Sequence, residues 1–229
     1  MEPIAVTKSS FVYFNGGEVT TVETMEPLPQ VVEDQVDVYY IAGPSGSGKT
    51  TFICKYLQKY RYMFPENRIA IFSRKTEDKN LDGCVKGGIE RIKLDEDLLN
   101  LDTIDLINEF ADSVVIFDDI ATIPDDEIRS KVYKIQNDLI TVGRDKNIYV
   151  MATNHQIRDG YKTRELLNEA THIVLFPGSN QGKINTFLKK AMDFDKHTIE
   201  TIKKLDTRWI DIHTRYPCYI ISEHKIFAY

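Results

Sequence analysis

With 229 residues, 42% of them hydrophobic and 28% charged, the chain is long enough for one α/β domain but not for two independent ones. No apolar stretch reaches the roughly 18 to 20 residues of a membrane-spanning helix, and the opening sequence MEPIAVTKSS predicts no secretory signal. A net charge of −6 excludes a protein that coats nucleic acid with its whole surface, although it leaves room for local basic loops.

Residues 1–35 contain short runs of alternating apolar and polar residues on either side of Asn15-Gly16-Gly17. An Asn-Gly pair between two alternating runs is typical of a β-hairpin. The proline-bearing sequence EPLPQ follows and is typical of a connecting segment. We therefore expect an N-terminal β-ribbon and linker over residues 1–35, and one larger domain over residues 36–229.

The sequence GPSGSGKT, at residues 43–50, lies between an apolar run and a helical pattern. Residues 36–42 (VDVYYIA) predict a buried strand, and apolar residues at helical spacing predict a helix over residues 50–64. A G-x-x-x-x-G-K-[ST] sequence in this context is typical of a phosphate-binding P-loop. A Gly/Ser-rich loop can match the pattern by coincidence, but the flanking strand and helix favour the phosphate site.

Each residue type in this loop has a chemical role in binding a phosphate. Glycine lets backbone N–H groups approach an anion closely, lysine brings a flexible positive charge to the β- and γ-phosphates, and the next hydroxyl can bind Mg²⁺. The free N–H groups and the dipole of the following helix favour the same anion. We therefore expect ATP and Mg²⁺ as ligands, with Thr50 on the metal. The predicted nucleotide-binding residues are Gly43, Pro44, Ser45, Gly46, Ser47, Gly48, Lys49, Thr50 and Thr51.

Strands and helices alternate along the rest of the chain. Further strands are expected at residues 68–73, 89–94, 113–119, 147–154 and 171–176, and further helices at residues 124–142, 161–170, 181–192 and 197–205. The first of these helices is expected to carry Pro124 in its first turn and to end at Gly143. Residues 209–229 predict a closing β-hairpin at a sheet edge. This order predicts an α/β fold with a mostly parallel central sheet flanked by helices.

Two acids end the apolar strand predicted at residues 113–119. Ligands of an open parallel sheet bind outside the carboxyl ends of its strands, so the sheet should bring these acids to the P-loop. Asp118 is predicted to hold Mg²⁺, directly or through water, and Asp119 to orient or deprotonate the attacking water. Asp119 could instead cap a turn. Asn154 ends the next apolar strand, where its amide could contact the γ-phosphate or the water, or simply open a turn.

Arg144 follows Gly143 at the end of a predicted helix. A cation is favoured there by the helix dipole, and this alone would explain its presence. An exposed guanidinium near a strand is also what a neighbouring subunit needs to stabilise charge during phosphoryl transfer. The second interpretation of Arg144 is therefore an arginine finger that acts on the site of another subunit.

Three segments together resemble one family: GPSGSGKT (residues 43–50), VVIFDD (114–119) and GRDKNIYVMATNHQ (143–156). They are similar to the FtsK/HerA superfamily of pumping ATPases. Within it, the paired acids and the segment before Asn154 are most similar to the genome-packaging ATPases of large, poxvirus-like DNA viruses and of internal-membrane icosahedral viruses. The resemblance covers roughly residues 36–176 and leaves the termini unassigned.

The resemblance implies a RecA-like ASCE core, in which the strand ending at Asn154 lies between the P-loop strand and the strand ending at Asp118. It implies an ATPase that forms a hexameric or pentameric ring and moves double-stranded DNA into a capsid. Its partners would be proteins of the capsid vertex or internal membrane, and its location the host cytoplasm, where the virus assembles, and the virion.

The resemblance also assigns roles to individual residues. It makes Lys49 and Asp119 catalytic, Asn154 the polar sensor and Arg144 the finger from the neighbouring subunit. The chain departs from the superfamily at two of these positions, because Glu is more usual than Asp119 and Gln more common than Asn154. Asp119 is one methylene shorter than Glu, so the attacking water would lie differently or another acid would serve.

Two basic loops are expected to leave the same sheet edge. Their candidate DNA-binding residues are Arg74 and Lys75 in the first loop, and Arg158, Lys162 and Arg164 in the second. Either loop could contact DNA phosphates without reading bases. Either could equally be an ordinary solvated surface.

Two other functions are compatible with a P-loop. The first is a kinase that phosphorylates a nucleoside or another small molecule, with residues 177–208 as its lid; this leaves Asn154 and Arg144 without a role. The second is a nucleotide-gated scaffold that does not hydrolyse its nucleotide, with Asp119 purely structural. DNA-stimulated ATP turnover, a nucleoside acceptor, or phosphate release that depends on Asp119 would separate these possibilities.

Overall fold

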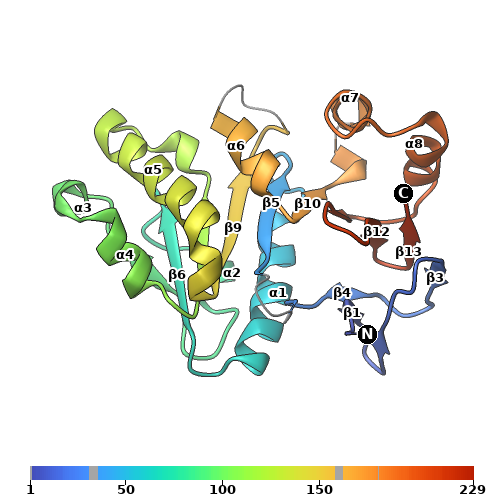
Figure 1. The fold of residues 1–229 in the computed structure, drawn as a ribbon, viewed down its shortest axis with the longest axis horizontal. Coiled ribbons are helices and arrows are strands. Elements are labelled where there is room, and N and C mark those ends of the chain that lie inside the picture. The colour runs from blue at the N-terminus through green and yellow to red at the C-terminus, as the bar shows by residue number, and fades with distance from the viewer. Residues whose placement is uncertain (1, 31–35, 158–161, 180) are drawn as a thin grey trace.

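The computed structural model describes residues 2–30, 36–157, 162–179 and 181–229 (Figure 1). Their largest sheet has ten strands in the order β3-β13-β12-β11-β10-β5-β9-β8-β6-β7. These strands are β3 (Glu18–Thr20), β5 (Val38–Ala42), β6 (Arg68–Ser73), β7 (Glu90–Ile92), β8 (Ser113–Asp118), β9 (Ile148–Asn154), β10 (His172–Leu175), β11 (Ile210–His213), β12 (Tyr219–Ser222) and β13 (Lys225–Ala228). The α-helices are α1 (Lys49–Met63), α2 (Lys79–Asp82), α3 (Glu96–Asn100), α4 (Thr103–Glu109), α5 (Asp126–Val142), α6 (Lys162–Glu169), α7 (Gln181–Lys190) and α8 (Lys196–Lys203).

Six neighbouring strands, from β10 to β7, pair in parallel. As the family resemblance implied, β9 lies between β5 and β8. The register pairs Ala42 with Asn154, and Thr153 with Asp118. The ends of the P-loop strand, the strand of Asn154 and the strand of the two acids therefore share one sheet edge, where ligands of parallel sheets bind.

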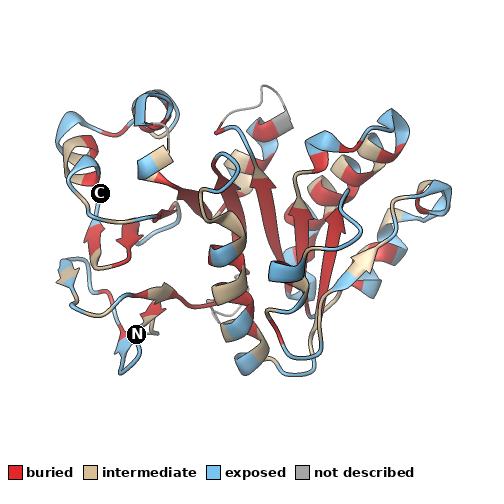
Figure 2. Cartoon of the chain, turned by 180° about the vertical axis from the view of Figure 1, so that it is seen from behind, coloured by how far each residue is buried: buried red, intermediate tan, exposed pale blue. Residues whose placement is uncertain are grey.

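The central strands are buried on both faces because alternate residues pack into two separate cores (Figure 2). On β5, Val38 and Tyr40 belong to the core under α4, α5 and α6, whereas Tyr39 and Ile41 belong to the core under α1. The predicted α/β class, with a mostly parallel sheet flanked by helices, is thus confirmed. The apolar runs of the sequence are the strands whose two faces are both covered.

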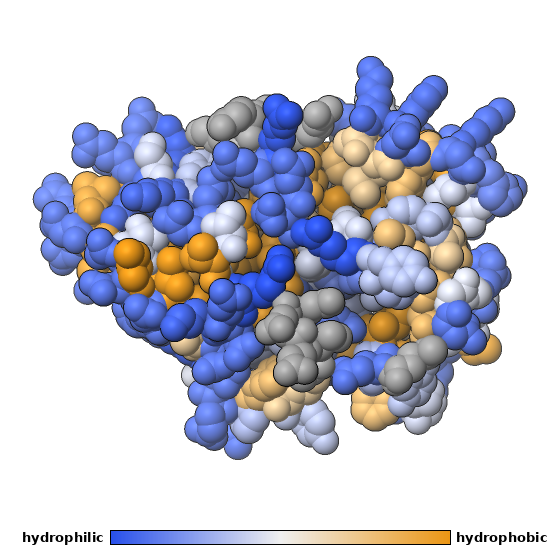
Figure 3. All heavy atoms as spheres, in the orientation of Figure 1, coloured by the Kyte–Doolittle hydropathy of each residue, from blue (hydrophilic) through white to orange (hydrophobic). Residues whose placement is uncertain are grey.

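The surface shown in Figure 3 is mostly hydrophilic, with an apolar patch over α3 and α4. Leu101 and Ile104 are exposed there. None of the helices in the described part of the chain combines the length and apolarity that crossing a membrane requires.

The N-terminal segment contains strands as predicted, but they pair differently. Strand β1 (Ala5–Val6) pairs with β2 (Phe11–Val12) and β4 (Glu26–Pro27) in a small antiparallel sheet. Its hairpin turn lies at Thr7–Ser10, where the Thr7 N–H donates to the Ser10 carbonyl at 2.9 Å. The hairpin predicted at Asn15-Gly16-Gly17 is wrong, because β3 after these residues pairs with β13. An open edge of the central sheet offers β3 a longer partner than β2 does.

The C-terminal prediction also needs correction. In place of one closing hairpin, β11, β12 and β13 form a three-stranded antiparallel meander, and β11 pairs with β10. A tight turn joins β12 to β13, and in it Ser222 Oγ accepts the Lys225 N–H at 3.0 Å. The meander therefore extends the central sheet, and β3 lies at its edge.

Helix α5 begins later than predicted. The carboxylate of Asp125 accepts the N–H groups of Glu127 and Ile128, both at 2.9 Å, so Asp125 is the N-cap and Pro124 precedes it. The first-turn position of Pro124 is thus wrong, because the acid satisfies the free N–H groups of the helix better than proline can. The helix does end at Gly143 as expected. Its buried residues include Ile128, Val132, Ile135 and Leu139.

Three short helices, α2, α3 and α4, were not predicted. They have four, five and seven residues, too few turns for a helical hydrophobic period to be visible. Asp78 and Asp102 cap two of them through their carboxylates. Asp78, which caps α2, also pairs with Lys75 of the loop that follows β6.

Candidate nucleotide-binding and hydrolysis site

The loop of residues 43–50 joins the end of β5 to the start of α1. The Gly43 N–H donates to the Asn154 carbonyl at 3.0 Å, which ties the base of the loop to β9. A Cβ at Gly43 would lie 2.6 Å from Ser47 Oγ and 2.8 Å from the Phe176 ring, so only glycine fits. Gly48 has a φ of 110°. These constraints give the loop the tight curvature of an anion cradle.

Helix α1 starts in a way that favours an anion. Its N-cap is Gly48, without a capping side chain, and its first turn has no acid. The first N–H groups of a helix have no partner within the helix, so here they remain available to a phosphate. Ser47 Oγ is also buried and lacks a hydrogen-bond partner among the described residues. Both features fit a loop that is completed by a bound triphosphate.

Lys49 is folded back onto its own loop. Its Nζ donates to the carbonyl of Gly43 at 2.6 Å and to that of Pro44 at 3.2 Å. Burial lowers the pKa of Lys49, against the opposing charges of Asp119 and Asp118. The ammonium therefore lies within the field of both acids, and phosphate oxygens can replace the two carbonyls as acceptors.

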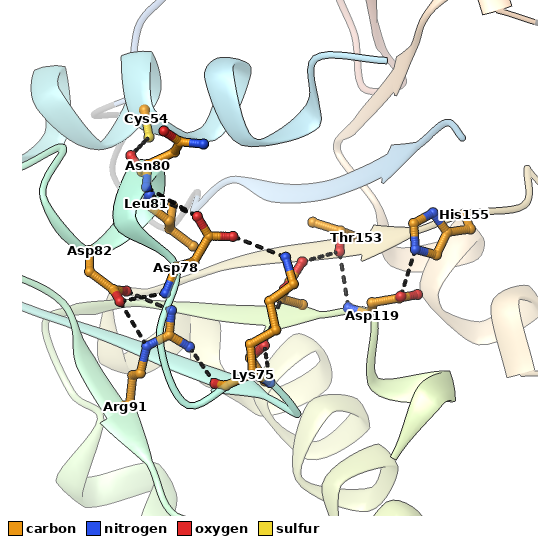
Figure 4. A network of polar contacts seen from close by, with 12 residues as sticks. Cys54, Lys75, Asp78, Asn80, Leu81, Asp82, Arg91, Asp119, Thr153 and His155 are labelled. Carbon is orange, nitrogen blue, oxygen red and sulfur yellow. Dashed lines mark hydrogen bonds and ion pairs between the residues drawn. The ribbon is translucent and has the colours of Figure 1, made fainter. Parts of the chain in front are cut away.

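The two acids at the end of β8 have different partners, and Figure 4 shows those of Asp119, which are Thr153 and His155. The Asp118 carboxylate accepts hydrogen bonds from Ser73 Oγ at 3.1 Å and from Thr153 Oγ1 at 2.9 Å. Asp119 has a φ of 53°, and its N–H donates to the same Thr153 oxygen at 3.0 Å. Its carboxylate meets His155 Nε2 at 2.7 Å. Thr153 thus contacts both acids, through the side chain of Asp118 and the backbone N–H of Asp119. The two carboxylates point to different neighbours.

The donor set suits a magnesium ion that is shared with a substrate. Asp118 and Thr50 offer one carboxylate and one hydroxyl, which are hard oxygen ligands. In the described part of the chain, no three His, Cys, Asp or Glu side chains gather as a metal site by themselves. Mg²⁺ commonly binds proteins through one or two carboxylates together with substrate phosphates. The residues present therefore fit Mg²⁺ bound with a nucleotide rather than alone.

Solved structures with the same fold include the genome-packaging NTPase B204 of Sulfolobus turreted icosahedral virus 2. Its complex with ATP-γS has a TM-score of 0.56 at 12% identity, covering 84% of this chain and 98% of that one. The AMPPCP complex has a TM-score of 0.54. The pCW3 conjugation coupling protein TcpA, with ATPγS, has a TM-score of 0.55 at 14% identity, covering 94% of this chain and 67% of that one.

No family model matches the sequence. The uncharacterized protein V3 of the Sputnik virophage, however, is 38% identical over 190 residues, which is 82% of this chain and 75% of V3. The chain therefore belongs to the same family as V3, and it shares its fold with B204 and TcpA. The order of its central strands and the position of its P-loop are those that the resemblance to the FtsK/HerA superfamily implied.

In this relative of V3, Asn154 and Arg144 lie at opposite ends of β9. Asn154 is at the carboxyl end, beside the P-loop, where its carbonyl holds Gly43. Arg144 lies in the 3-10 helix Gly143–Lys146 before the strand. A seven-residue strand is roughly 20 Å long, so Arg144 cannot reach the P-loop of its own chain. It lines a separate cavity of about 310 Å³ with Glu169 and Arg215.

The predicted DNA-binding residues have different surroundings. Arg74 and Lys75 line a hollow of about 550 Å³ together with Asp118 and Asp119. The Lys75 Nζ pairs with Asp78 at 3.0 Å, and this bond raises the pKa of Lys75. Arg164 is exposed on α6. Arg158 and the side chain of Lys162 lie outside the described residues.

Several residues of the site were not anticipated. The two acids are held by Ser73, Thr153 and His155. Two of these residues, Ser73 and Thr153, are hydroxyl residues at the ends of apolar strands, and this sequence signal could have indicated them. Beside the P-loop, Phe176, Trp209 and Arg208 line a small cavity of about 60 Å³. Trp209 packs edge-on against Phe52 of α1, with ring centroids 5.2 Å apart. No sequence pattern indicated that residues so far along the chain lie against α1.

Proposed function

We propose that this protein is the motor ATPase of a viral genome-packaging machine, which hydrolyses ATP and moves double-stranded DNA into a capsid. The observation that carries the proposal is the pair of differently held acids, Asp118 and Asp119, whose charges act on the P-loop lysine, Lys49. B204, which shares the fold, is a genome-packaging NTPase, and V3 is a virophage protein. Both similarities support a role in a virus.

In the proposed reaction, the P-loop N–H groups and Lys49 hold the β- and γ-phosphates. Thr50 and Asp118 would hold Mg²⁺, which would supply positive charge to the phosphate oxygens when bound. Asp119 takes a proton from water as the water oxygen attacks the γ-phosphorus, and the bond to the β–γ bridging oxygen breaks to release ADP and phosphate. Asn154 contacts the γ-phosphate. The cavity at Trp209 is also lined by Ser47, Gly48 and Thr51, so it is our candidate for the site of the base.

The proposal predicts that linear double-stranded DNA raises the rate of ATP hydrolysis several-fold. Because the contacts would be to DNA phosphates, the stimulation should fall as salt is added. The measurement is phosphate release at constant ATP and increasing DNA, with particle size followed by light scattering to detect a ring. A DNA-independent rate would contradict translocation.

The same assay separates the kinase alternative. Nucleosides in place of DNA should leave ATP turnover unchanged and yield no nucleoside monophosphate. Transfer of phosphate to a nucleoside would instead establish a P-loop kinase and overturn the packaging proposal.

We assign Arg144 to the site of a neighbouring subunit, because it is too far from the P-loop of its own chain. Arg144→Ala and Asp119→Asn subunits should each be nearly inactive alone. When the two are mixed in equal amounts, about a quarter of the interfaces in a randomly assembled ring combine an intact Asp119 on one subunit with an intact Arg144 on its neighbour. ATP hydrolysis should therefore partly return on mixing.

The matched control for Arg144 is Lys146→Ala, an exposed cation of the same 3-10 helix, which should hydrolyse ATP normally. If mixing Arg144→Ala with Asp119→Asn restores no activity while both still assemble, the proposed action between subunits is wrong.

The remaining parts of the proposal concern partners and organisation. Residues 36–229 would be the ATPase domain, to which residues 1–35 add the small sheet and the edge strand β3. Arg74, Lys75 and Arg164 are candidates for the DNA contact, together with Arg158 and Lys162. The ring would dock on proteins of the capsid vertex or internal membrane, in the host cytoplasm where the virus assembles and in the virion.

A further inference from the structure

His155 is the one described side chain in contact with both the P-loop lysine and the second acid. Its Nδ1 lies 3.4 Å from Lys49 Nζ, and its Nε2 lies 2.7 Å from an Asp119 carboxylate oxygen. The residue directly follows the strand β9, opposite the end of β8, and its side chain is 46% exposed. No pattern in the sequence assigned it a role.

The chemistry of its two neighbours determines how the imidazole is protonated. An ammonium can only donate, so Nδ1 facing Lys49 must accept and carry no proton. A carboxylate can only accept, so Nε2 facing Asp119 must carry one. These two contacts fit the tautomer that carries its proton on Nε2 and leaves Nδ1 as an acceptor.

Thr153 and His155 contact different parts of Asp119. Thr153 accepts the Asp119 N–H at 3.0 Å and so holds the backbone of the turn. Only His155 holds the carboxylate among the contacts found in the described residues. The backbone contact of Thr153 leaves the direction of the carboxylate to His155.

Resting on the proposed function, we propose that His155 is a positioning residue for ATP hydrolysis, which aims the Asp119 carboxylate and links it to Lys49. Two of the three Lys49 donors are used by the carbonyls of Gly43 and Pro44. Lys49 can exchange these two for phosphate oxygens and keep the third on His155. The arrival of a nucleotide at Lys49 is thereby connected to the orientation of Asp119.

His155→Ala should lower kcat for ATP hydrolysis by about 10- to 100-fold. The Asp119 carboxylate is still present in this variant, but it is no longer held in the correct orientation. The Kd for a fluorescent ATP analogue should stay unchanged, since the phosphate contacts of the P-loop remain. His155→Gln should recover most of kcat, because its amide N–H can donate to Asp119 as Nε2 does. The matched control is His197→Ala, an exposed histidine on α8.

Two further measurements test the mechanism. In the Asp119→Asn background, His155→Ala should cause no additional loss, since the carboxylate it positions is already gone. Nitrogen-15 NMR of the full chain should show the neutral His155 ring with its proton on Nε2. This second readout does not depend on ATP hydrolysis.

These experiments separate failure of the proposed role of His155 from failure of the proposed function. If the wild-type protein hydrolyses ATP and His155→Ala does so equally fast, only the role of His155 is overturned. A larger Kd with unchanged kcat, an Nδ1–H ring, or full additivity with Asp119→Asn would overturn it as well. Absence of ATP hydrolysis by the wild type would overturn the proposed function itself.

Discussion

Asp119→Asn should lower kcat for ATP hydrolysis by about 10²- to 10⁴-fold, the usual contribution of a general base. The amide keeps the shape of the side chain but cannot take a proton from water. Binding of ATP should change little, because Lys49 and the N–H groups of the P-loop keep their contacts to the phosphates. Phosphate release under single-turnover conditions and the Kd of a fluorescent ATP analogue measure the two effects separately.

Glu77→Gln is the matched control for this experiment. Glu77 is exposed and lines the same hollow as Asp118 and Asp119, which makes it the candidate if another acid serves in place of Asp119. We expect Glu77→Gln to hydrolyse ATP normally. If Glu77→Gln loses activity while Asp119→Asn keeps it, the general base is Glu77. Full activity of both variants would exclude a carboxylate base in this hollow. If neither variant nor the wild type releases phosphate, the nucleotide-gated scaffold is favoured.

Asp211→Asn should lower the free energy of unfolding by about 3–5 kcal/mol, because it removes one partner from a buried ion cluster. Both Asp211 carboxylate oxygens contact His172 Nδ1, at 3.0 and 3.1 Å. On the other side of the ring, Asp37 lies 3.4 Å from Nε2, an ion-pair distance rather than a hydrogen bond. The cluster joins β10, β11 and the residue before β5, so it ties the meander to the P-loop strand.

The effect of Asp211→Asn should depend on pH. Burial alone would lower the pKa of His172, but Asp211 and Asp37 outweigh it and raise the pKa to about 10. The ordinary histidine pKa is about 6.5, so the stabilisation is complete below this pH and is lost as the pH rises through 10. The stability difference between wild type and Asp211→Asn should therefore shrink from pH 6.5 to pH 10.

Urea unfolding at several pH values measures this difference, and Asp206→Asn is the matched control. Asp206 is an exposed acid five residues earlier, and its substitution should change stability little. A difference between wild type and Asp211→Asn that grows as the pH rises would contradict a charged His172.

Much of the fold was predictable because it depends on local patterns. Apolar runs such as residues 113–118 become strands buried on both faces, and the spacing of Ile128, Val132 and Ile135 defines the buried side of α5. The pairing of β3 was not predictable in this way. The hairpin signal at Asn15-Gly16-Gly17 is local, whereas β13, the partner that β3 adopts, is about 200 residues away.

The sequence by itself determined the chemistry of the phosphate site. GPSGSGKT carries its function in consecutive residues, because the curvature of the loop, the lysine and the start of α1 all lie within one short segment. The ends of apolar strands likewise located Asp118, Asp119 and Asn154, since parallel strands bring their carboxyl ends to one edge.

Only the tertiary structure decided which side chains support those groups. Ser73, Thr153 and His155 reach the acids through the register of β6, β8 and β9, and Trp209 reaches α1 through the meander. Arg144 and Asn154 are close in sequence, yet the strand between them separates them by its whole length. Contacts across a sheet are set by pairing and packing over long chain separations, which no local pattern of residues encodes.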